Sequence, residues 1–67
     1  MKYNEENYVG KKIQLYPSDT YRKFGVIKRV DDLGWTVEIT ESKCGSFDIG
    51  KEYFISHSEG FTFEFIR

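Results

Sequence analysis

The stretch Trp35-Thr36-Val37-Glu38-Ile39-Thr40 decides the fold class, because apolar and polar residues alternate in it without a break. Successive side chains of a β-strand point to opposite faces, so Trp35, Val37 and Ile39 share one face. The polar residues between them share the other face. This alternation predicts a strand with one face in a core and the other face in water.

The same alternation recurs near both ends of the chain. Phe61–Phe65 alternates phenylalanine with polar residues, and Ile13 and Leu15 stand two positions apart. Between these stretches, Asp31–Gly34 has the composition of a tight turn, in which Gly34 is suited to a positive φ. The sequence therefore predicts several short strands joined by turns.

Two further apolar stretches are less regular. In Phe24–Val30 the residues Val26 and Ile27 are adjacent, and Gly25 is the position where a bulge or bend fits. Tyr53–His57 has apolar residues on both faces. It is therefore either a strand covered on both sides or a strand with Tyr53 and Ile55 on an exposed patch.

The chain is long enough for one domain with a small core. Its 67 residues include six Phe, five Tyr and one Trp, and such rings bury large areas. Because closure removes the exposed edges of a small sheet, we predict an all-β fold, a small barrel of five or six strands over residues 11–67. Residues 1–10 are either flexible or contain one helical turn. The predicted core consists of Ile13, Leu15, Val26, Val30, Trp35, Val37, Ile39, Phe47, Phe54, Phe61, Phe63 and Phe65.

The segment Tyr21–Ile39 resembles the strand–turn–strand centre of SH3-like barrels, especially those of the KOW and Tudor types. In these families a glycine precedes an apolar strand, an acidic turn follows, and an alternating strand returns. Here the corresponding positions are Gly25, Val26, Val30, the turn Asp31–Gly34, and Val37. The resemblance covers less than a third of the chain. It implies binding rather than catalysis, since KOW modules bind RNA, ribosomes or RNA polymerase and Tudor barrels often hold methylated side chains. The chain also resembles accessory proteins of phages and mobile elements.

Net charge and cysteine content restrict the class of partner and the cellular compartment. The net charge is −1, unlike the basic KOW modules that bind nucleic acid. Residues 11–29 carry six basic side chains against Asp19 alone, whereas residues 30–67 carry three basic and eight acidic ones. A single cysteine is typical of a reducing compartment, so we expect a cytoplasmic protein. No apolar run approaches the roughly 20 residues of a membrane span, and we expect no membrane partner.

Catalysis is not predicted. Cys44 and His57 are the only residues of their kinds, which leaves no set of four ligands for a structural zinc ion and no evident third group for a nucleophilic pair. Asp31 and Asp32 precede a turn glycine, where aspartates usually bond their own backbone. We therefore expect no enzyme activity, no metal and no cofactor.

The strongest candidate site combines basic and aromatic residues. The basic cluster comprises Lys11, Lys12, Arg22, Lys23, Lys28 and Arg29. Interleaved aromatic residues give it the mixture that binds nucleic-acid backbones and bases. The alternative is a solvated face whose cations pair with Glu38, Glu41 or Glu64 across strands.

Aromatic residues exceed what the predicted core needs. Those left over are Tyr3, Tyr8, Tyr16, Tyr21, Phe24 and Tyr53. They either form an interface, for which tyrosine is favoured, or cap the ends of the barrel. We predict a protein–protein interaction module or small regulator or inhibitor, with a nucleic-acid-binding barrel as the alternative and homo-oligomerisation as a variant. The predicted partner-binding residues are Tyr16, Tyr21, Arg22, Lys23, Phe24, Lys28, Arg29 and Tyr53.

Overall fold

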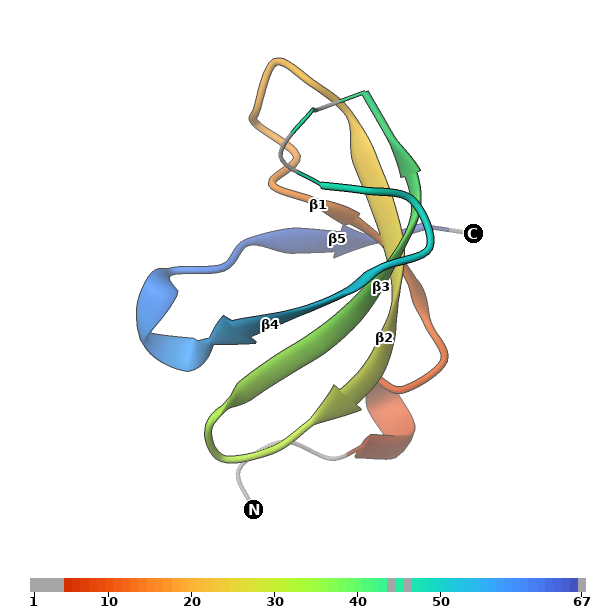
Figure 1. The fold of residues 1–67 in the computed structure, drawn as a ribbon. Coiled ribbons are helices and arrows are strands. Elements are labelled where there is room, and N and C mark those ends of the chain that lie inside the picture. The colour runs from red at the N-terminus through yellow and green to blue at the C-terminus, as the bar shows by residue number, and fades with distance from the viewer. Residues whose placement is uncertain (1–4, 44, 46, 67) are drawn as a thin grey trace.

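The fold is all-β, as predicted. A computed structural model describes residues 5–66 except 44 and 46, and in it five strands form one antiparallel sheet (Figure 1). The strand order is β4-β3-β2-β1-β5, so that the last strand returns beside the first. The strands are β1 (Lys12–Leu15), β2 (Lys23–Val30), β3 (Gly34–Ser42), β4 (Glu52–Ser56) and β5 (Phe63–Phe65), with short 3-10 turns η1 (Glu5–Asn7) and η2 (His57–Glu59).

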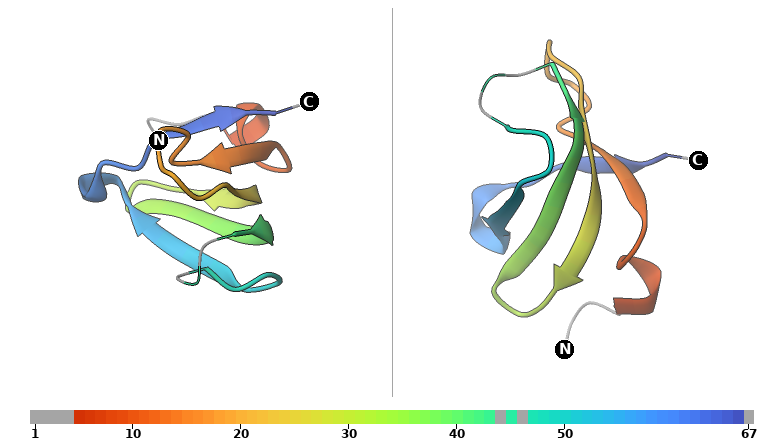
Figure 2. Two further views of the ribbon diagram at one scale, coloured as in Figure 1. Left: turned by 90° about the horizontal axis from the view of Figure 1, so that it is seen from above. Right: turned by 45° about the vertical axis from the view of Figure 1, so that its right-hand side comes forward.

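The sheet twists strongly around its buried inner face (Figure 2). The alternation predicted for β3 is confirmed, since Trp35, Val37 and Ile39 are all buried. Ile27 pairs with Val37 and Trp35 pairs with Ile55, which aligns apolar side chains on that face. The buried core is Ile13, Leu15, Ile27, Val30, Trp35, Val37, Ile39 and Ile55.

Bulges in β2 decide which of its apolar residues face inward. The register of β2 against β3 shifts between Phe24 and Gly25, which confirms the irregularity predicted at Gly25, and shifts again between Ile27 and Arg29. The prediction of Val26 as a core residue was wrong. Ile27 is fully buried, whereas Val26 lies half-buried opposite Glu38. The second bulge restores inward packing at Val30.

Two phenylalanines predicted for the core are exposed. Phe54 keeps 55% and Phe65 keeps 54% of its surface in solvent. In β4 it is Ile55 that is buried, so Phe54, one position earlier, lies on the outer face. Phe65 is on the inner side of the sheet, like Phe63. Because β5 is an edge strand, no strand beyond it covers the Phe65 ring.

Gly34 is required for close packing and not for the positive φ that we predicted. Positive φ among the described glycines occurs at residues 10, 50 and 60. A Cβ on Gly34 would overlap the carbonyl group of Ile55 in the neighbouring strand. The turn before it is built as predicted, because the Asp31 carboxylate accepts hydrogen bonds from the N–H groups of Leu33 and Gly34 at 2.9 and 3.1 Å.

The segment before β1 packs onto the sheet. Gly10 donates its N–H to the carbonyl of Ile27 at 2.8 Å, and the Tyr8 ring meets the Trp35 ring edge-on at a centroid distance of 5.1 Å. η1 supplies a single helical turn within this segment. Residues 1–4, which include Tyr3, lie outside the described residues. No helix in the described part of the chain has the length and hydropathy to cross a membrane.

Glu38 and Glu52 face each other across β3 and β4. Like charges directly opposite destabilise a sheet, whereas opposite charges contribute roughly 0.2–1 kcal/mol. We therefore expect Glu52→Lys to raise the free energy of unfolding by about 0.5 kcal/mol in urea titrations at low salt. Glu59→Lys, outside the strands, is the control. An unchanged or lower stability for Glu52→Lys at low salt would contradict this prediction.

Candidate interaction surface

The loop between β1 and β2 is anchored by a buried lysine. Lys23 is only 1% exposed, and its ammonium donates to Asp19 Oδ2 at 2.7 Å and to the Tyr21 carbonyl at 3.1 Å. The same ammonium lies 5.6 Å from the centre of the Tyr16 ring. The cation therefore holds the loop together. Lys23 was predicted as a partner-binding residue, but its ammonium is buried and hydrogen-bonded to Asp19 and Tyr21 of the same chain.

Tyr16 begins this loop in an unusual conformation. Its φ is +47°, in the left-handed region that side-chain-bearing residues rarely adopt. Its N–H donates to the carbonyl oxygen of Thr62 at 2.8 Å, and its own carbonyl oxygen accepts the N–H of Asp19 at 2.9 Å. Its ring packs edge-on against the ring of Phe61. Burial raises the pKa of the Tyr16 phenol above its ordinary value; the charge of Glu59 adds to the rise and that of Lys23 opposes it. Tyr16 is thus a structural residue of the loop.

Tyr21 and Arg22 are the predicted partner-binding residues that this loop exposes. Tyr21 keeps 58% of its surface in solvent, and Arg22 is also exposed. The Arg22 carbonyl accepts a hydrogen bond from the N–H of Lys43 at 2.9 Å, which joins this loop to the one that follows β3. That second loop exposes Ile49 to 64%. One aromatic, two cationic and one aliphatic side chain are therefore exposed on two connected loops, and we call them the loop surface (Tyr21, Arg22, Lys43 and Ile49).

Tyr53 supports the second loop from the inner face. Its ring meets Phe47 edge-on at 5.0 Å, and its hydroxyl accepts the N–H of Asp48 at 2.8 Å. It is half-buried. Tyr53, predicted as a partner-binding residue, therefore supports the second loop through Phe47 and Asp48.

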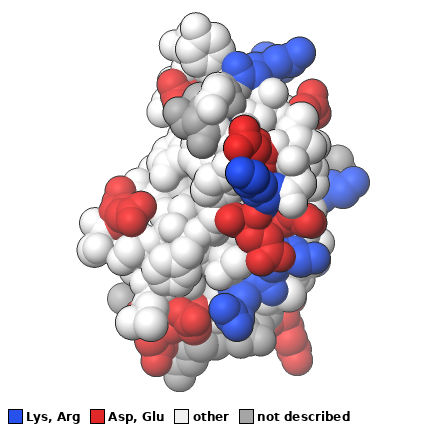
Figure 3. Space-filling model, in the orientation of Figure 1, with Lys and Arg blue, Asp and Glu red and all other residues white. Residues whose placement is uncertain are grey.

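Phe24, Lys28 and Arg29 lie on β2. Phe24 is half-buried opposite Glu41, and both cations are exposed. Lys28 approaches Glu38 with 3.9 Å between Nζ and Oε1. Figure 3 shows basic and acidic side chains intermixed on the face that it presents, so the charge separation along the sequence is not kept there.

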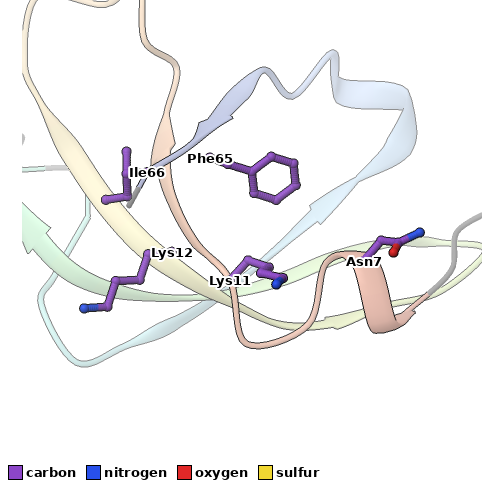
Figure 4. Close-up of a pocket in the computed structure, with 5 residues that line it drawn as sticks. All are labelled: Asn7, Lys11, Lys12, Phe65 and Ile66. Carbon is purple, nitrogen blue, oxygen red and sulfur yellow. The ribbon is translucent and has the colours of Figure 1, made fainter.

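Sequence reasoning missed two hollows beside β5. One has a volume of about 240 Å³ and is lined by Asn7, Lys11, Lys12, Phe65 and Ile66 (Figure 4). The other, of about 440 Å³, is lined by Pro17, Ser18, Thr62, Phe63 and Glu64. Both combine residues from the two ends of the sequence. No local pattern brings these residues together, since their proximity depends on the pairing of β1 with β5.

His57 has a structural partner. Its Nε2 lies 2.6 Å from the carbonyl oxygen of Asp31, and its ring meets Trp35 edge-on at 5.5 Å. These contacts join η2 to the turn between β2 and β3. Cys44, the other member of the pair considered for catalysis, lies outside the described residues.

Two carboxylates should make stability sensitive to acid. The hydrogen bond from Lys23 lowers the pKa of Asp19, and the backbone donors of Leu33 and Gly34 lower that of Asp31, from an ordinary value of 3.8. The folded state thus binds these protons less readily than the unfolded state. The stabilisation is complete above the unfolded pKa and is lost as pH falls through the folded pKa.

We expect the urea midpoint to fall as pH drops below about 4. The fall should be smaller for Asp31→Asn, which removes one of the two titrating groups, when midpoints are measured by circular dichroism at several pH values. Parallel profiles for wild type and Asp31→Asn would contradict the assignment to Asp31.

Relatives of the chain were sought in three ways. Comparisons with models of known protein families, with curated proteins and with solved structures gave no match.

Proposed function

We propose that this chain is a cytoplasmic, non-enzymatic protein–protein interaction module built as a small SH3-like barrel. The strand order supports the barrel, because four consecutive strands form a meander and β5 returns to the far side of β1. The described sheet is not closed, because β4 and β5 are its two edges. Ring contacts cross the inner face, since the ring centroids of Trp35 on β3 and Phe63 on β5 lie 5.1 Å apart.

The observation that carries the function is the loop surface. Exposed tyrosine and arginine are favoured at the centres of interfaces, and Tyr21 and Arg22 are adjacent there. The buried Lys23 contacts both Asp19 and the Tyr21 carbonyl, so the loop is held before any partner arrives. Binding by a preformed loop loses less conformational entropy.

The distribution of cations favours a protein partner over nucleic acid. Non-specific binding of single strands uses a continuous basic groove with stacking rings. Here Lys23 is buried, Lys28 lies near Glu38, and Glu41 is paired with Phe24 in the ladder. Acidic side chains thus interrupt the basic cluster.

The test is a pull-down with the tagged chain from host lysate, with and without nuclease and at low and high salt. We expect a discrete protein partner that survives nuclease and salt and is lost with Tyr21→Ala. Leu33→Ala, at a still more exposed site on the turn between β2 and β3, is the control and should retain the partner.

A different result would favour the alternative. Recovery of nucleic acid that is lost on raising salt, and lost with Lys28→Glu combined with Arg29→Glu, would indicate a nucleic-acid-binding barrel, because binding to phosphates weakens with salt. A concentration-dependent rise in mass of the purified chain, abolished by Tyr21→Ala, would indicate homo-oligomerisation.

A further inference from the structure

β5 is an edge strand with half of its backbone groups facing away from the sheet. Among the described residues it pairs with β1 alone. The N–H of Ile66 donates to the carbonyl oxygen of Lys12, and the carbonyl oxygen of Thr62 accepts the N–H of Tyr16. Hydrogen-bonded pairs alternate along an antiparallel ladder, so Glu64 also faces β1. The N–H and C=O groups of Phe63 and Phe65 consequently point outward, where another strand can pair.

The two hollows lie at the two ends of β5, where its residues meet those of β1 and the segments next to β1. The larger one is at the start of β5, beside Thr62 and Glu64, and the smaller one is at its end, beside Phe65 and Ile66. The distance from Thr62 to Ile66 is about 13 Å for an extended chain. A partner strand of about five residues therefore has the length that separates the two hollows.

The smaller hollow combines an apolar ring with two cations. In Figure 4, Asn7, Lys11 and Phe65 lie on one side of β1, and Lys12 and Ile66 lie on the other. Both lysines are exposed, and none of the ion pairs between described side chains includes them. The ring of Phe65 is more than half exposed although it belongs to the inner side of the sheet. This hollow therefore suits a ligand with an apolar side chain that packs on Phe65 and an acidic side chain that pairs with Lys11 or Lys12.

We propose that the free edge of β5 binds an extended acidic peptide segment of a partner protein, which adds to the sheet as a further strand. Main-chain pairing supplies affinity and the hollows supply specificity, as in other cases of strand addition. Lys11 and Lys12 select the acidic end of the segment. The inference rests on the proposed function and names the chemistry of the partner, at an edge separate from Tyr21.

A peptide fits this edge better than a nucleic-acid strand does. The outward backbone groups of Phe63 and Phe65 need alternating donors and acceptors, which a polypeptide backbone provides at the spacing of a strand. Glu64 lines the larger hollow and would repel phosphates. One end of the edge is therefore basic and the other acidic, which matches a segment that carries its acidic residues at the Lys11 end.

The probe is a library of random heptapeptides displayed on phage and selected against the full chain. We expect enriched sequences to combine acidic residues with β-branched residues in alternation. The synthetic consensus peptide should slow amide hydrogen exchange at Phe63 and Phe65 by about tenfold or more, because these two groups become paired. The amide of Glu64, which already faces β1, should change little.

Variants and a modified peptide separate this site from others. Lys11→Glu with Lys12→Glu should weaken binding by about tenfold, as expected for lost charge pairs. Lys51→Glu, a charge reversal at an exposed lysine outside both the loop surface and the β5 edge, should leave it within about twofold. The consensus peptide methylated on the amide nitrogens that face β5 should not bind.

Three outcomes would overturn the inference: no enriched peptide, a consensus without acidic residues, or binding that survives both the lysine changes and methylation. A thymidine oligonucleotide that displaces the peptide and protects no amide of β5 would instead assign the hollow to nucleic acid. If Tyr21→Ala removes the partner from lysate while the peptide experiments fail, the proposed function stands and only the β5 site is wrong.

Discussion

Gly34→Ala is expected to lower the free energy of unfolding by about 3 kcal/mol, a large part of what a domain of this size has. The added Cβ would overlap the Ile55 carbonyl oxygen and lie 2.9 Å from the Ile55 carbonyl carbon. These are backbone atoms of a paired strand, and Trp35 pairs directly with Ile55. The strand cannot retreat without breaking the ladder between β3 and β4.

Urea unfolding followed by circular dichroism measures this effect. Gly45→Ala is the matched control, because a Cβ there meets nothing within 4 Å. The Cβ on Gly34 would also lie 2.8 Å from Phe54 Cζ, but that ring is exposed and can turn away. Adding Phe54→Ala to Gly34→Ala should therefore not restore stability. A rescue by that second change would assign the clash to the ring and not to the backbone.

Trp35→Ala is expected to cost about 3–5 kcal/mol, the usual range for deleting a buried large ring. Trp35 is 6% exposed, and its ring contacts Tyr8 and Phe63 edge-on, each at 5.1 Å between centroids. It also meets the His57 ring at 5.5 Å. Its loss therefore loosens the N-terminal segment, β5 and η2 together.

Circular dichroism in urea is the appropriate measurement, since the variant lacks the only tryptophan. Leu33→Ala, at a side chain 72% exposed, should cost less than about 0.5 kcal/mol. Trp35→Phe keeps part of the ring packing, so its loss in free energy of unfolding should lie between those of Leu33→Ala and Trp35→Ala. A loss below about 1 kcal/mol for Trp35→Ala would show that the ring cluster does not stabilise the fold.

The alternation of residues predicted β3 and the inward positions of Ile13 and Leu15, because strand period alone decides which face a residue takes. It failed in β2, where one bulge precedes Val26 and a second lies between Ile27 and Arg29, so that Val30 faces inward and Val26 does not. It also failed at Phe65, since a residue can face inward from an edge strand and still lack cover. Bulges and edges are set by tertiary pairing, which a local pattern does not contain.

The sequence pointed to the residues of the candidate site but did not separate those that support the loop, such as Lys23, from those that it exposes, such as Tyr21. Lys23 was expected at the surface because lysines are rarely buried without a partner. A signal was present, since Lys23 shares the period of Gly25 and Ile27 and stands four residues after Asp19. The exposure of Tyr21 agrees with the expectation that it is not needed in the core. Its contact with a partner stays a prediction.

The pairing of β1 with β5 also has a kinetic consequence. Leu15 and Phe63 pair across about fifty residues of chain, whereas β2 joins β3 through one short turn. Long-range pairings form slowly, so β5 should dock last during folding and detach first during thermal fluctuations. A partner strand laid on β5 would then clamp the part of the sheet that opens most readily. The lifetime of the folded chain would depend on whether that partner is bound.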